Sequence, residues 1–204
     1  MICRFGFLLV VMVLACGAAP ITFNFTGTVT QVPIDDLYGD ITFGDAVQIS
    51  LTFEGTATDQ IPGDPATASY VSLGAPYGMT VTFPTHVFTA SDSLQIGIMN
   101  GAVDQYTVLA TGPLGSLTLE LFLQDNSGAV FGDDSLPLSA PLLSAFVLQD
   151  FHLHEVSNLG ETQVDGQLTG VTGPTTPPGA GVPEPGTGML LLGGLAGLIA
   201  VRRR

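Results

Sequence analysis

The histidines of His152-Leu153-His154 are the side chains in this sequence best placed to do chemistry. Residues two apart on a β-strand point to the same face, so both imidazoles can reach one metal ion. His86 and Asp150 are candidates for a third ligand, and Asp150 shares the strand parity of the two histidines. Two ligands without an assured third are also typical of a solvated strand surface. The pattern favours that reading over zinc.

Carboxylates gather around the turn Asp125-Asn126-Ser127-Gly128, with Asp133 and Asp134 a few residues later. Carboxylate and amide oxygens are the ligands that calcium prefers. The spacing does not match an EF-hand loop, and residues of this kind are ordinary in hairpin turns. We therefore predict no metal or other cofactor. Calcium bound by Asp125, Asp133 and Asp134 is the alternative.

The sequence lacks the patterns of nucleophilic and nucleotide chemistry. It contains no Gly-x-Ser-x-Gly elbow and no phosphate-binding glycine loop, and Cys3 and Cys16 both precede the predicted body. Tryptophan is absent, and most of the four tyrosines, Tyr38, Tyr70, Tyr77 and Tyr106, fit packing positions better than sugar-stacking positions. We predict a protein that is not an enzyme. An extracellular hydrolase is the less favoured alternative.

Alternating apolar and polar residues dominate residues 20–172. The clearest strand is Ile21–Thr30, where Ile21, Phe23, Phe25 and Val29 share one face and threonines line the other. Further strands are predicted at 47–54, 70–73, 79–83, 94–99, 106–110, 117–124, 149–156 and 163–172. The connections are rich in Gly, Pro, Asn and Asp, and no stretch shows a helical period.

This pattern predicts an all-β body built as an antiparallel two-sheet β-sandwich, similar to a jelly roll, with a closed barrel as the alternative. The first and last strands share a Gly-x-x-Thr pattern, Gly27 to Thr30 and Gly166 to Thr169. We expect these two strands to be near neighbours.

Charge is segregated along the chain. All four basic residues are Arg4 and Arg202 to Arg204, whereas the body contains acidic residues and neither Lys nor Arg. Such a body repels nucleic acid, which we exclude as a partner. Calcium or basic partners remain compatible with it, although a solubilising acidic surface is the simpler interpretation.

Residues 1–19 have the order of a secretory signal: Arg4, then the apolar run Phe5–Ala15, then Gly17-Ala18-Ala19. We expect an N-terminal signal helix that is removed by the general secretion machinery. Val13-Leu14-Ala15-Cys16 loosely resembles a lipobox, and lipidation of Cys16 is the alternative.

The other end of the chain combines a linker, a turn, an apolar run and a cationic stop. Residues 173–181 are rich in Pro and Gly and predict a linker. Val182-Pro183-Glu184-Pro185 predicts an extended segment, because the prolines cannot continue a helix. The following apolar run ends at Arg202-Arg203-Arg204 and predicts a short transmembrane helix whose arginines stay cytoplasmic.

Residues 182–204 resemble the PEP-CTERM sorting signal of exosortase substrates, a tail type that has also been labelled the C-terminal region of ice-binding proteins. We do not read that label as evidence of ice binding. The resemblance implies export, retention in the inner membrane with the body in the periplasm, and cleavage near Val182–Pro185 by an exosortase. It also implies a final place at the cell surface or in the extracellular matrix.

Together these features predict a signal peptide (1–19), a body (20–172), a linker (173–181) and a sorting tail (182–204). The favoured function is that of a non-enzymatic surface or matrix protein linked to extracellular polysaccharide and biofilm. A calcium- or glycan-binding module is the alternative.

Overall fold

The computed structural model describes residues 20–32, 39–157 and 160–174. The segments predicted as the signal helix and the sorting tail lie outside these residues. Within the described ranges, no helix has the length and apolar character needed to cross a membrane.

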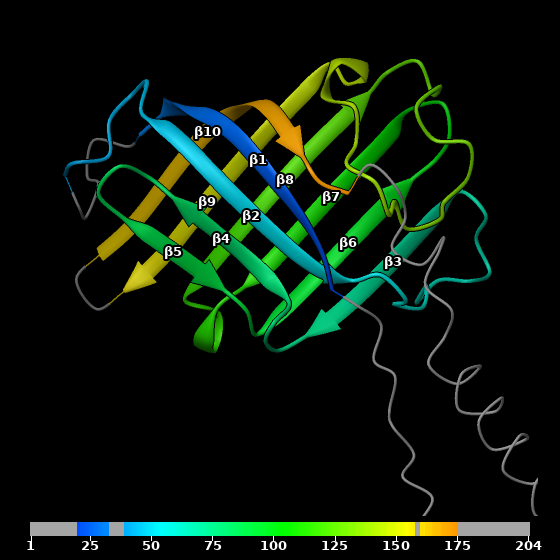
Figure 1. Ribbon diagram of the computed structural model, residues 1–204, viewed down its shortest axis with the longest axis horizontal. Coiled ribbons are helices and arrows are strands. Elements are labelled where there is room, and N and C mark those ends of the chain that lie inside the picture. Colours follow the sequence, from blue (N-terminus) through cyan, green and yellow to red (C-terminus); the bar gives the residue numbers. More distant parts are fainter. Residues whose placement is uncertain (1–19, 33–38, 158–159, 175–204) are drawn as a thin grey trace, which may run out of the picture.

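The described chain forms ten strands and two short 3-10 helices (Figure 1). The strands are β1 (Pro20–Gln31), β2 (Ala46–Glu54), β3 (Thr67–Leu73), β4 (Gly78–Thr82), β5 (Val87–Ala90), β6 (Ser93–Met99), β7 (Asp104–Thr111), β8 (Leu117–Asp125), β9 (Leu148–Ser157) and β10 (Gly160–Thr172). The 3-10 helices are η1 (Pro113–Gly115) and η2 (Leu143–Ala145).

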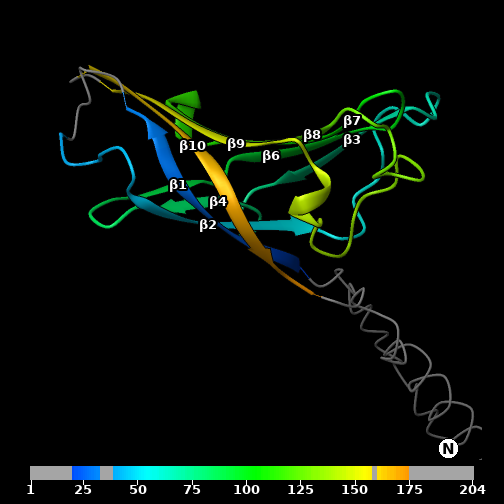
Figure 2. The same ribbon diagram turned by 90° about the horizontal axis from the view of Figure 1, so that it is seen from above.

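All ten strands belong to one antiparallel sheet with the order β3-β6-β7-β8-β9-β10-β1-β2-β4-β5. The sheet curls so that β2, β4 and β5 lie over β6, β7 and β8 (Figures 1 and 2). Direct contacts between β4 and β6, β4 and β7, and β5 and β8 join the two layers. The edge strands β3 and β5 do not pair with each other, so the curled sheet stays open.

The prediction of an all-β antiparallel body is confirmed, but the two sheets of a sandwich are one continuous sheet. The physical reason is the β1–β10 pairing, which runs from Asn24 opposite Thr172 to Gln31 opposite Asp165 and carries hydrogen bonding from one layer to the other. The register shifts between Thr26 and Gly27 and between Val29 and Gln31. Irregularities of this kind, such as bulges, increase the local twist of a sheet and favour its curling. The pairing also confirms that the first and last strands are neighbours.

Alternation along the strands places the core between the two layers. On β1, Ile21, Phe23, Phe25 and Val29 are buried, whereas Asn24, Thr26, Thr28 and Thr30 are exposed. The core continues through Leu119 and Leu121 on β8. This burial of one face of each strand is the main stabilising contribution in a body of this kind.

Candidate functional site

His152 and His154 lie on the outer face of β9 and are held by carboxylates of β10. His152 Nδ1 lies 2.8 Å from Asp165 Oδ1, and His154 Nε2 lies 2.7 Å from Glu161 Oε1. Asp165 is directly opposite His152 in the β9–β10 register, whereas Glu161 is reached diagonally. Each imidazole therefore has its own carboxylate partner on the neighbouring strand.

His86 does not join these two histidines as a third ligand. Its Nε2 lies 2.6 Å from Asp40 Oδ1, and its ring packs beside Phe88. Asp150 lies opposite Phe122 on β8 and Gln167 on β10. Across the described ranges, no group of three or more His, Cys, Asp or Glu side chains is arranged to hold a metal ion.

The carboxylates of the predicted calcium site are used separately in turns. Asp125 accepts hydrogen bonds from the Ser127 hydroxyl and, at 3.3 Å, from Ala129 N–H. The Ser127 hydroxyl is the main cause that lowers the pKa of Asp125 below its usual value. Asp133 accepts from the hydroxyl and N–H of Ser135, and these bonds lower its pKa in the same direction.

Asp134 and Asn126, from the same part of the sequence, also make hydrogen bonds within the protein. The backbone carbonyl of Asp134 accepts a hydrogen bond of 2.9 Å from the Tyr70 hydroxyl. The Asn126 side-chain oxygen accepts one of 2.7 Å from Gln124 Nε2. The structure thus gathers the predicted residues into one loop region, where Asp125, Asn126 and Asp133 make local contacts and Asp134 accepts a hydrogen bond from β3.

Asp104 is a buried carboxylate that the sequence analysis did not single out. It is fully buried at the start of β7, and its Oδ2 accepts hydrogen bonds from Val130 N–H (2.7 Å) and Phe131 N–H (2.9 Å). Its Oδ1 accepts one of 3.2 Å from Gly101 N–H. The sequence did contain a sign that Asp104 is buried, because it lies an even number of residues before Tyr106 and Val108 and so shares their inward-facing side of the strand.

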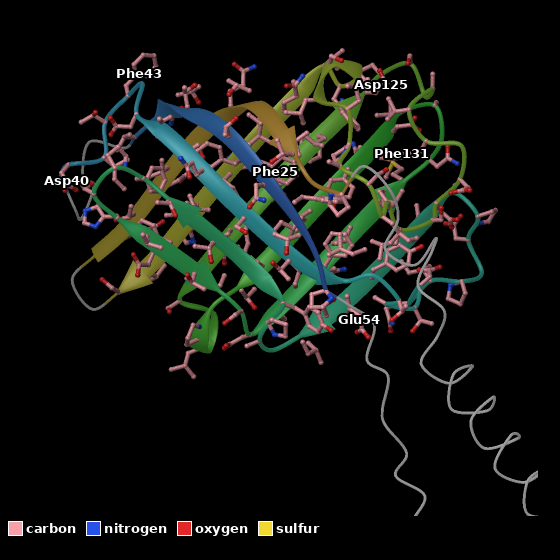
Figure 3. All side chains as sticks on the ribbon, in the orientation of Figure 1. Phe25, Asp40, Phe43, Glu54, Asp125 and Phe131 are labelled. Carbon is pink, nitrogen blue, oxygen red and sulfur yellow. The ribbon has the colours of Figure 1, made fainter. Side chains whose placement is uncertain are left out.

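The segment 126–147, which these bonds hold, forms a groove of its own. The groove has a volume of ≈ 590 Å³ and is lined by residues such as Val130, Phe131, Pro137, Pro141 and Leu142. Asp133 is the one ionisable residue among the groove's lining residues. Asp125 and Phe131 mark this side of the molecule in Figure 3, far from Asp40 and its His86 partner. The groove therefore has no cluster of titratable side chains that resembles an acid–base site.

The fold and these contacts place the protein in the class of all-antiparallel β proteins. In the part of the chain that the structure describes, the polar side chains discussed above mainly hold turns and neighbouring strands in place. A family model described as the PEP-CTERM protein-sorting motif matches residues 181–204. The chain thus carries the sorting signal that residues 182–204 resemble, including Val182 to Pro185 and Arg202 to Arg204. The comparison with curated proteins and the comparison with solved structures give no match.

The motif implies an exported protein that is anchored in the membrane before an exosortase processes it. The sorting residues themselves lie outside the described part of the structure.

Proposed function

We propose that this protein is a non-enzymatic component of the cell surface or extracellular matrix, delivered there by exosortase-dependent processing of its tail. The sorting motif at residues 181–204 is the observation that carries the proposal. The acidic β body is the cargo, and it acts as a structural or adhesive module within extracellular polymer.

The positions of the chain ends in the fold support this reading. Asn24, near the start of β1, is directly opposite Thr172, near the end of β10. The segments that precede Pro20 and follow Pro174 therefore join the body at one end of the same strand pair. A body connected in this way can stand on a membrane by one end and present the turn that carries Phe43 outward.

The use of polar side chains supports a role without catalysis. His86, His152 and His154 each contact a different carboxylate, and Asp104 and Asp125 accept hydrogen bonds from the loop beside them. These groups are used to hold strands and turns together, which is what a structural module requires.

The test is replacement of Pro183, Glu184 and Pro185 by alanine in the native cell. The proposal expects the variant to stay in the membrane fraction with its tail uncleaved, because the processing enzyme has lost its recognition segment. Replacement of Pro177 and Pro178 by alanine in the linker is the matched control and should be processed normally. Unchanged processing and release of the motif variant would contradict the proposal.

A further inference from the structure

The outer surface of β1, β2, β4, β5 and the last part of β10 is made mainly of uncharged polar side chains. Strand register aligns one residue from each of these strands in a single row: Thr172, Asn24, Ser50, Thr80 and Thr89. The next row contains Gly170, Thr26, Gln48, Thr82 and Val87. We call the polar members of these two rows, together with Thr22, Thr28 and Thr52, the neutral face.

The neutral face is ordered by contacts between its own hydroxyl groups. Thr22 Oγ1 lies 3.0 Å from Thr52 Oγ1, and Thr80 Oγ1 lies 3.2 Å from Thr89 Oγ1. Hydroxyl groups both donate and accept, so a residue already in one such contact retains capacity for another. The face therefore presents donors and acceptors at positions fixed by the sheet.

Charge separates this face from the opposite one. Glu54, at the end of β2, is the single ionisable residue within β1, β2, β4 and β5. The outer face of β8, β9 and the first half of β10 instead carries Glu120, Asp150, His152, His154, Glu161 and Asp165. In a chain of net charge −14, the neutral face is a surface that an uncharged ligand can cover without removing water from ionised carboxylates.

A groove of ≈ 360 Å³ crosses the neutral face over four strands. Asn24, Gln48, Ser50 and Thr82 are among its lining residues, and Gly170 forms part of its wall. A Cβ at position 170 would lie 2.7 Å from Thr26 Oγ1, so glycine leaves room for the Thr26 side chain at this point of the groove. The groove offers amide and hydroxyl groups and no charge.

An exposed aromatic ring stands at one end of the face. Phe43 is 78% exposed, in a turn held to β1 by the 2.9 Å hydrogen bond from Gly44 N–H to Val29 O. The ring points into solvent at the end of the face opposite Glu54 (Figure 3). Because a strand rises about 3.3 Å per residue, the stretch from Asn24 to Thr30 alone spans about 20 Å, which suits a chain polymer.

We propose that the neutral face, its groove and Phe43 bind a neutral polysaccharide chain. Sugar hydroxyls match the hydroxyl and amide groups of the groove, and Phe43 supplies apolar area for a sugar ring. The acidic body disfavours polyanions, and a polycation has a better site on the face of His152 and Asp165. The binding is weak at each site and is strengthened when many copies share one polymer. A biological role for this binding rests on the proposed function, in which the protein is located at the cell surface or in the extracellular matrix.

The test is affinity electrophoresis of the full-length protein in detergent, through gels that contain dextran, xyloglucan or alginate. Retardation by at least one neutral polymer and not by alginate is the expected result. Phe43→Ala and Gln48→Glu should each weaken the binding about tenfold or more, since the first removes the stacking ring and the second places a charge in the groove. Neither side chain is part of the core, so folding is retained.

Two matched controls separate the site from general surface effects. Leu73→Ala removes a similarly exposed apolar side chain from β3, and Gln163→Glu adds the same charge on the acidic face of β10. Both controls should bind like the unaltered protein. Absence of binding to both neutral polymers, preference for alginate, or equal losses in the control variants would overturn the inference. Processing of the tail is measured separately in cells. A negative result there would contradict the proposed function, whereas a negative result in the gels would contradict only polysaccharide binding.

Discussion

Asp104 and Asp125 lie directly opposite each other on β7 and β8, and both carboxylates accept hydrogen bonds from the segment 126–147. Two buried carboxylates side by side repel each other unless nearby donors compensate. Here the donors are backbone N–H groups and the Ser127 hydroxyl. The pair therefore fixes the long connection between β8 and β9 to the end of the sheet.

Asp104→Ala should lower the free energy of unfolding by about 3 kcal/mol, because N–H groups of Gly101, Val130 and Phe131 lose a charged acceptor. Urea unfolding followed by circular dichroism measures this change. Asp92→Asn, at an exposed position, is the control and should stay near the stability of the unaltered protein. An Asp104→Ala protein of unchanged stability would show that the segment is held by other contacts.

The Tyr106 hydroxyl is buried and lacks a hydrogen-bond partner in the structure, and its burial raises the pKa of the phenol. Tyr106→Phe should therefore leave the free energy of unfolding unchanged or raise it by up to about 1 kcal/mol. Tyr70→Phe should instead lower it by about 1 kcal/mol, since the Tyr70 hydroxyl donates to Asp134 O. Thermal unfolding of the two variants compares them directly. The opposite order of stability would contradict this assignment.

Acid should destabilise the protein partly through Asp125 and Asp133, whose pKa values are lowered mainly by the Ser127 and Ser135 hydroxyls. An unfolded Asp has a pKa of about 3.9, so this stabilisation is present above that pH and is lost as pH falls through the lowered values. The double variant Ser127→Ala, Ser135→Ala should show a shallower loss of unfolding free energy as the pH falls below about 4. Identical pH profiles would refute the prediction.

The seam between β1 and β10 depends on glycine at position 166. A Cβ there would lie 2.0 Å from Phe151 Cε1 and 2.5 Å from Thr28 O. Gly166→Ala should therefore lower the free energy of unfolding by roughly 2–3 kcal/mol. Gly63→Ala, where a Cβ meets nothing within 4 Å, is the control. Equal stability of the two variants in urea would mean that the seam can shift to accept a side chain.

Removal of divalent metal should leave stability unchanged. The carboxylates of Asp104, Asp125 and Asp133 accept hydrogen bonds from N–H and hydroxyl groups, which offset their negative charge. We expect the unfolding temperature in EDTA to equal that in calcium. A higher unfolding temperature in calcium than in EDTA would support calcium binding by these carboxylates instead. It would also show that the turns rearrange around an ion.

Alternation in the sequence was sufficient to place β1, β2 and β8, because it reports which side chains face the core. It does not report strand pairing, and for that reason a sandwich and a single curled sheet look alike until the β1–β10 pairing is known. Strand β5 has only four residues, Val87–Ala90, which is too short for a reliable period and explains why it was not predicted.

The contacts of the candidate sites were harder to predict, because they join residues far apart in the chain. Nothing local to His86 indicates Asp40, and nothing local to Asp104 indicates the N–H groups of Val130 and Phe131. The rows of the neutral face could not be predicted from the sequence, because they depend on how five strands are paired and in which register. The sorting tail, in contrast, is a linear signal, so the sequence alone was enough to find it.

Mass spectrometry of both ends of the mature protein from its native cell tests the central claim most directly. The account predicts an N-terminus created by cleavage after Gly17, Ala18 or Ala19, and a C-terminus near Val182–Pro185. A mature chain that retains both Met1 and Arg204 would contradict it.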